Sequence, residues 1–176
     1  MKIGKVTPTK IGAACLLVNG IILLFYALFV PTFARGVHWL IFLAAILFVL
    51  AIPAIYDSIR RLNRIAARVV AALFGVAMIA IIASDLLFIS LFLTAFSREL
   101  TYALGNALFL IGVLTIGFVT LKGVFYKWVA YLSIITGVVG LASYLPQTSG
   151  PLATLSLSLL GLWSLAVGFN IRKLTK

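Results

Sequence analysis

Six long apolar stretches follow one another along the chain, and short segments that hold most of the charged residues separate them. Each stretch is close to the ~20 residues that an α-helix needs to cross a hydrocarbon core of about 30 Å. This pattern predicts an all-α integral membrane protein whose single domain is a bundle of six transmembrane helices. The predicted spans are residues 11–30, 38–56, 69–96, 102–121, 128–145 and 152–171.

The composition agrees with lipid as the solvent for most of the chain. Of the 176 residues, 64% are hydrophobic and 10% are charged, whereas soluble domains have about 25% charged residues. The mean hydropathy is +1.26. A soluble fold of this size could not bury so much apolar surface. We therefore expect a multi-pass protein of the cell membrane.

The basic residues lie on one side of the predicted spans. The formal net charge is +11, but short basic segments between apolar stretches are typical of loops beside anionic headgroups, not of a surface that binds nucleic acid. All but Arg35 and Arg98 of the 14 Lys and Arg residues lie in the N-terminal segment, the connectors 57–68 and 122–127, and the C-terminal tail. Both termini are therefore predicted to be cytoplasmic, with membrane lipids and their anionic headgroups as partners.

The connector 57–68 carries arginines at a helical spacing. Arg60, Arg64 and Arg68 are four residues apart, so on a helix they would form one stripe over an apolar face. Such a stripe can lie at the level of the headgroups. We expect these three arginines to contact headgroups as ordinary cytoplasmic anchors, rather than to form a specific lipid site.

Small residues at helical spacing predict how the last two spans pack. Helices in lipid associate through small residues and interhelical hydrogen bonds. Ser133, Gly137 and Gly140 share one face of the fifth span. Because a short uncharged turn joins this span to the sixth, we expect a close antiparallel hairpin. The small residues on the matching face of the sixth span are Thr154, Ser158, Gly161 and Gly168.

One acidic residue, Asp85, interrupts the third span. From the rise per residue it lies in the outer half of the membrane, where an acid costs at least ~2.5 kcal/mol on insertion scales and indicates function by default. It is either a carboxylate that handles protons or cations in an outward-open cavity, or a protonated group that fixes helix packing. The sequence leaves both interpretations open. The candidate ligand- or ion-binding residues at comparable depth are Tyr26, Asn106, Ser156 and Ser158.

The remaining polar residues indicate no catalytic or metal site. Cys15 and His38 are the only residues of their types, and the three acids, Asp57, Asp85 and Glu99, are predicted at three different depths. They cannot form a carboxylate pair or a metal-binding cluster, and the chain has no glycine-rich phosphate loop. We therefore expect no catalytic residues, no metal and no cofactor, and a protein that is not an enzyme.

The short loops and the few polar residues inside the spans favour one function over two others. The first expectation is a structural or accessory subunit of a larger membrane assembly, with other membrane subunits or further copies of this chain as partners. The alternative is a small transporter or binding protein for a small molecule, ion or lipid that uses the carboxylate of Asp85. An intramembrane enzyme acting on lipid ranks below both, because no catalytic constellation is present.

Overall fold

A computed structural model of the protein shows an all-α fold in the described part of the chain. It has six helices and no strand among the described residues. These residues are 7–29, 38–89, 95–144 and 151–174, without the side chains of residues 38, 85–89, 95–98 and 151. The helices are α1 (Pro8–Phe29), α2 (His38–Ile59), α3 (Arg64–Ile89), α4 (Ala95–Thr120), α5 (Lys127–Ala142) and α6 (Pro151–Leu174).

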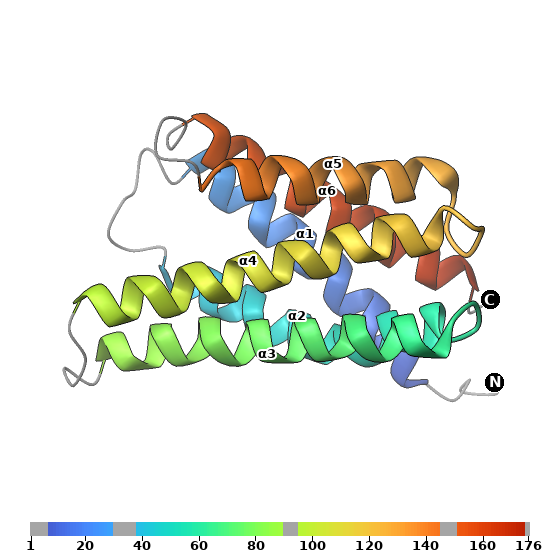
Figure 1. The fold of residues 1–176 in the computed structure, drawn as a ribbon, viewed down its shortest axis with the longest axis horizontal. Coiled ribbons are helices and arrows are strands. Elements are labelled where there is room, and N and C mark those ends of the chain that lie inside the picture. Colours follow the sequence, from blue (N-terminus) through green and yellow to red (C-terminus); the bar gives the residue numbers. More distant parts are fainter. Residues whose placement is uncertain (1–6, 30–37, 90–94, 145–150, 175–176) are drawn as a thin grey trace, which may run out of the picture.

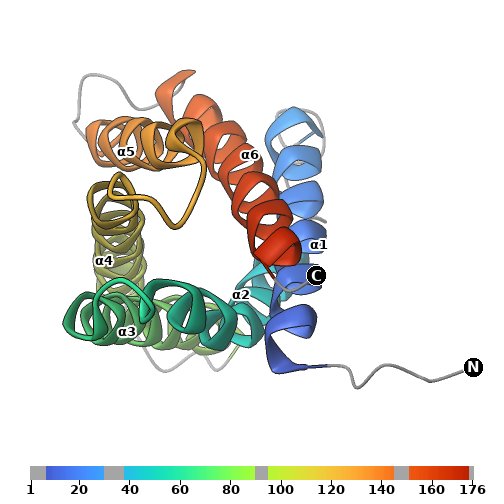
Figure 2. The same ribbon diagram turned by 90° about the vertical axis from the view of Figure 1, so that its right-hand side faces the viewer.

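The helices form a closed ring in chain order. Each helix packs against the next one along the chain, and α6 returns to pack extensively against α1. The view from one end shows this ring (Figure 2). The start of α1, the α2–α3 and α4–α5 connections and the end of α6 lie together at one end (Figure 1), which we call the near end. The opposite end, where α1 ends and α2 begins, is the far end.

Five of the six helices are long and apolar enough to cross a membrane. This agrees with the prediction of a multi-pass membrane protein. The exception is α5, which has 16 residues and is therefore about 24 Å long at the helical rise. That is short of a hydrocarbon core of about 30 Å. The helix nevertheless packs between α4 and α6 within the ring, and Figure 1 shows it alongside them.

The boundary between the third and fourth helices differs from the prediction. The third span was predicted to reach residue 96, with a connector at 97–101, but α3 ends at Ile89 and α4 begins at Ala95. The predicted connector is therefore part of α4. The error has a physical cause. Hydropathy reports which residues lipid can solvate, but it does not report where a helix begins. A helix can extend beyond the apolar zone of the membrane with charged residues in its first turns.

The connector between α2 and α3 is a turn and not one continuous helix. The backbone leaves the helix after Ile59 and re-enters it at Arg64. Asn63 starts α3, because its Oδ1 accepts hydrogen bonds from the backbone N–H groups of Ile65 (2.9 Å) and Ala66 (3.1 Å), as an N-cap residue does. Arg60 therefore lies in the turn, outside the helix that carries the other arginines, and the expected three-arginine stripe is wrong.

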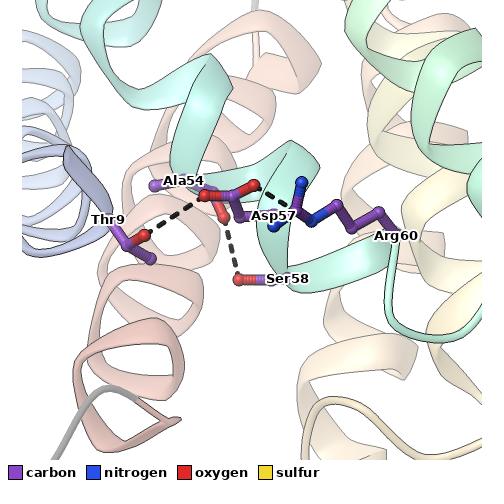
Figure 3. A network of polar contacts seen from close by, with 5 residues as sticks. All are labelled: Thr9, Ala54, Asp57, Ser58 and Arg60. Carbon is purple, nitrogen blue, oxygen red and sulfur yellow. Dashed lines mark hydrogen bonds and ion pairs between the residues drawn. The ribbon is translucent and has the colours of Figure 1, made fainter. Parts of the chain in front are cut away.

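A polar network holds α1 against the end of α2 at the near end. The hydroxyl of Thr9 donates to Oδ2 of Asp57 (3.3 Å), and Nε of Arg60 lies 3.2 Å from Oδ1 of the same carboxylate. Ser58 next to it donates to the carbonyl of Ala54 (2.8 Å). Figure 3 shows these contacts. Asp57 thus has partners on both sides, and the network ties α1 to α2.

The small residues of α5 and α6 do not pack against each other as expected. A methyl group added at Gly137 would lie 2.8 Å from Cβ of Leu114 in α4, and one added at Gly161 would lie 3.0 Å from the carbonyl oxygen of Gly20 in α1. Of the six neighbouring pairs in the ring, α5 and α6 make the least extensive contact. The two helices are antiparallel neighbours, as a hairpin requires, but the expected close packing through small residues is wrong, because the glycines of each helix face its other neighbour.

Four aromatic side chains fill the middle of the ring. Phe48 (α2), Phe74 (α3), Phe109 (α4) and Trp163 (α6) all contact one another, with ring centroids 4.8–6.4 Å apart. All six pairs are edge-to-face or tilted and avoid the face-to-face sandwich that aromatic quadrupoles disfavour. We call this group the aromatic plug. Its members come from four helices, and among these α3 and α6 lie on opposite sides of the ring.

Candidate functional site

A cavity lies inside the ring on the far side of the aromatic plug. Its volume is about 80 Å³, and Phe48 and Phe109 of the plug form part of its wall. All helices except α5 contribute to the described lining. These residues are Asn19 and Leu23 from α1, Ile41, Ala44, Ala45 and Phe48 from α2, Met78 and Ile81 from α3, Tyr102, Asn106 and Phe109 from α4, and Leu157 and Leu160 from α6.

Asn19 is the most unusual residue of this cavity. It lies at the middle of α1 and is only 2% exposed, yet its Oδ1 atom is fully buried and accepts no hydrogen bond. Leaving such a group unpaired costs about 1–3 kcal/mol, and buried polar groups in native structures are nearly always paired. Because this oxygen is fully buried, the parts of Asn19 that border the cavity are other atoms of the residue.

Asn106 reaches the same cavity from α4. Its Nδ2 donates to the backbone carbonyl of Tyr102 (2.9 Å), which holds the amide in place on its own helix. An amide nitrogen carries two hydrogens, so one remains beyond the bond to Tyr102. Asn106, one of the predicted site residues, thus lines this cavity, and its binding of a ligand stays a prediction.

The other predicted site residues do not line the cavity among the side chains that the structure describes. Asp85 lies in α3, but its side chain is outside the described residues. Tyr26 and Ser156 are buried elsewhere in the bundle. The hydroxyl of Ser158 donates to the carbonyl of Thr154 on its own helix (2.9 Å). Among the described side chains of the predicted polar layer, Asn106 alone lines the cavity.

The three arginines of the predicted headgroup site are all exposed at the near end. Arg60 is paired with Asp57, whereas Arg64 and Arg68 lie one turn apart in the first turns of α3. Their positions suit contact with headgroups, and contact with lipid stays a prediction.

Sequence reasoning missed Asn19 as a site residue. The signal was present, since an amide at the middle of an apolar span is costly in lipid unless it is paired. What the sequence did not contain was the direction in which the side chain points. That direction depends on the close approach of α6 to the neighbouring Gly20, where an added methyl would lie 2.7 Å from the carbonyl oxygen of Gly161.

The chemistry available at the cavity is neutral hydrogen bonding within apolar walls. None of the described lining residues is charged, and the described residues contain no cluster of His, Cys, Asp or Glu that could hold a metal ion. Comparisons with protein-family models, with curated proteins and with solved structures find no match. The geometry of the cavity therefore carries the functional argument alone.

Proposed function

We propose that this protein binds a small, mostly apolar molecule inside the membrane, in the cavity between the aromatic plug and the far end. The observation that carries the proposal is a cavity with apolar walls and two asparagine amides, Asn19 and Asn106. Ligand sites commonly combine a mainly apolar lining with a few placed polar groups. This is the binding or transport alternative of the sequence analysis, at a different place from the one centred on Asp85.

Filling the cavity should abolish binding. In Ala44→Leu the larger side chain would occupy the cavity, because Ala44 is a buried wall residue. Ala72→Leu adds the same atoms to an exposed position of α3 and is the matched control. Native mass spectrometry of protein extracted gently from its own membrane should find a small adduct on the wild type and the control but not on Ala44→Leu. An adduct on all three, or on none, would count against the proposal.

We also propose that all six helices span the membrane and that the near end is cytoplasmic. The support is the distribution of positive charge, which orients membrane proteins. The basic side chains described at the near end are Lys10, Arg60, Arg61, Arg64, Arg68, Lys122, Lys127, Arg172 and Lys173. The short helix α5 needs its own test, because its length alone does not require it to span.

Cysteine labelling at the two ends of α5 tests this topology. In a Cys15→Ala background, Lys122→Cys precedes α5 and Tyr144→Cys follows it, and both positions are exposed. A membrane-impermeant maleimide should label Tyr144→Cys in intact cells and Lys122→Cys only after permeabilisation. Labelling of both positions from the same side would show that α5 does not cross.

An accessory-subunit role is the second candidate, and one surface feature favours it. An apolar hollow lies on the outside of the bundle between α5 and α6, the loosest neighbouring pair. Exposed aromatic side chains surround it, including Trp128, Tyr131 and Phe169. A membrane helix of another subunit could pack there.

Co-purification tests this second candidate. In mild detergent, a stoichiometric partner should be lost from Phe169→Ala and retained by Ile79→Ala, which removes another exposed apolar side chain, from α3. If the wild type and both variants purify as well-behaved particles without a partner, this result would argue against a subunit role.

A further inference from the structure

We infer that the outer hollow between α5 and α6 binds one anionic phospholipid, with an acyl chain in the hollow and the headgroup at the near end. This inference goes beyond the ligand of the inner cavity and rests on the proposed topology, which places the near end among cytoplasmic headgroups. The hollow has a volume of about 560 Å³ and shares no described lining residue with the cavity. Its walls can be reached from outside, since Tyr131, Ile135 and Phe169 are each more than half exposed.

Both walls of the hollow end in basic residues at the near end. On α6, Phe169 lines the hollow, and the next turn of the same face carries Arg172 and Lys173, because residues three and four apart are neighbours on a helix. On α5, Lys127 lies one turn before the wall residue Tyr131. All three basic side chains are exposed.

Contacts between the two helices bring these basic ends together. Nζ of Lys173 lies 5.2 Å from the centre of the Tyr126 ring, and the backbone N–H of Tyr126 donates to Oδ1 of Asn170 (3.3 Å). Tyr126 immediately precedes Lys127, the first residue of α5. The cations of α5 and α6 are therefore gathered at the near mouth of the hollow.

This group of cations has no acidic residue on its own helices. No acidic residue follows Glu99 in the sequence. Glu99 itself is in the first turns of α4 and Asp85 is in the last turns of α3, both toward the far end. Asp57 is already held by Thr9 and Arg60. An anionic group from outside the chain is therefore suited to the near mouth, and the anionic phospholipids of the cytoplasmic leaflet are attracted to basic segments.

The length of the hollow favours a lipid chain over a helix of another subunit. Its described walls extend over residues 128–135 of α5 and 162–169 of α6, which is about 10 Å along each helix at the helical rise. That length lies within one leaflet, because the whole hydrocarbon core is about 30 Å thick. A partner helix that spans the membrane calls for a longer groove, whereas one acyl chain enters only one leaflet.

Quenching of Trp128 by brominated lipid tests the inference at the hollow itself. Trp128 lines the hollow and is 56% exposed, whereas Trp163 is fully buried, and Trp39→Phe removes the remaining tryptophan. This parent protein, the full chain, would be reconstituted in phosphatidylcholine vesicles. The vesicles would contain the same minor fraction of either brominated phosphatidylglycerol or brominated phosphatidylcholine, with identical acyl chains. Quenching should correspond to an enrichment of phosphatidylglycerol of about fivefold at Trp128, the factor that one basic residue contributes at an anionic surface.

Two triple variants separate a site from general attraction to a basic protein. The first removes the three cations of the hollow, and its substitutions are Lys127→Gln, Arg172→Gln and Lys173→Gln. The matched control removes the same charge from exposed positions in the α2–α3 connection and the start of α3, and its substitutions are Arg61→Gln, Arg64→Gln and Arg68→Gln. The first variant should lose the enrichment, and the control should retain it.

A further pair of variants tests the acyl chain. In Ala166→Leu the larger side chain would occupy the hollow, because Ala166 is one of its wall residues. Ala72→Leu, at an exposed position of α3, is again the matched control. The enrichment at Trp128 should be lost in Ala166→Leu and kept in Ala72→Leu. If Ala166→Leu does not fold, the comparison of the triple variants still decides whether a site exists.

The other outcomes overturn the inference. Equal quenching of the parent by both lipids, or equal loss of enrichment in the two triple variants, shows only general attraction. Enrichment that persists in Ala166→Leu shows that no chain occupies the hollow. Quenching by neither lipid means that a second copy of the chain covers the hollow or, if labelling finds both ends of α5 on one side, that the proposed topology is wrong. The adduct of the inner cavity is measured separately, so its presence or absence is unaffected by these results.

Discussion

The hydrogen bond between Trp163 and Ser133 gives the most direct test of how α5 is held in the ring. Nε1 of Trp163 donates to Oγ of Ser133 over 2.8 Å, and Ser133 in turn donates to the carbonyl of Val129. Both side chains are completely buried. Since α5 and α6 otherwise make limited contact, this bond is a principal link between them, and Ser133→Ala would leave the indole N–H without its acceptor.

The expected magnitude follows from the buried position of the bond. An unpaired buried donor costs about 1–3 kcal/mol in soluble proteins, but interhelical hydrogen bonds in membranes average about 0.6 kcal/mol and reach about 1.7 kcal/mol. We expect the upper part of the membrane range, because the Trp163 ring is fixed in the aromatic plug and cannot turn to another acceptor. Ser133→Ala should therefore cost about 1–1.7 kcal/mol in the free energy of unfolding.

A double-mutant cycle separates the bond from changes in packing. Trp163→Phe removes the donor but also removes ring atoms, so its own cost mixes the two effects, whereas the coupling energy isolates the bond. Reversible unfolding in bicelles would be measured for both single variants and the double variant. Ser84→Ala is the control, because the buried Ser84 donates only to the carbonyl of Ile81 in its own helix. If Ser133→Ala costs the same with and without the Trp163 indole, the bond contributes nothing and the reasoning is wrong.

Two further predictions concern helix contacts and helix ends. Gly20→Ala should destabilise the bundle by about 1–3 kcal/mol, because the new methyl would lie 2.7 Å from the backbone oxygen of Gly161. Gly75→Ala is the control and should cost nothing, because no atom lies within 4 Å of the methyl that it adds. Equal unfolding free energies for the two variants would contradict a close α1–α6 crossing. Asn63→Ala should lower the unfolding free energy by about 1 kcal/mol and Asn63→Asp should restore it, because an N-cap needs a side-chain acceptor; the same unfolding measurement checks both.

The architecture was largely predictable because lipid imposes a simple rule on the sequence. Runs of apolar residues near the length of a hydrocarbon core indicate helices, and six helices are present near the predicted places. Helix ends followed a different rule. Asn63 starts α3 through hydrogen bonds to the next backbone N–H groups, and this local cap divided a connector whose arginine spacing had suggested a continuous helix.

The candidate site was much less predictable, because depth in the membrane is only one of two coordinates. Asn106 and Ser158 were both expected at a similar depth, yet the first lines the cavity and the second donates to Thr154 within α6. The second coordinate is the rotation of each helix about its axis, which depends on where neighbours approach most closely. The packing of α6 against Gly20 sets that rotation for α1, and no spacing within one span reveals it.

Closure of the ring by α1 and α6 has a consequence for biosynthesis. Helix α1 leaves the ribosome before α6 and packs against it, so the face of α1 beside Gly20 must wait in lipid until α6 has been inserted. Such contacts between distant parts of a chain form late in folding. Leu157 and Leu160 of α6 are wall residues of the cavity, which therefore has no complete wall in the nascent chain. The cavity is complete only once α6 has been inserted, and a membrane quality-control system could distinguish molecules with and without this helix in place by whether the polar middle of α1 has been covered.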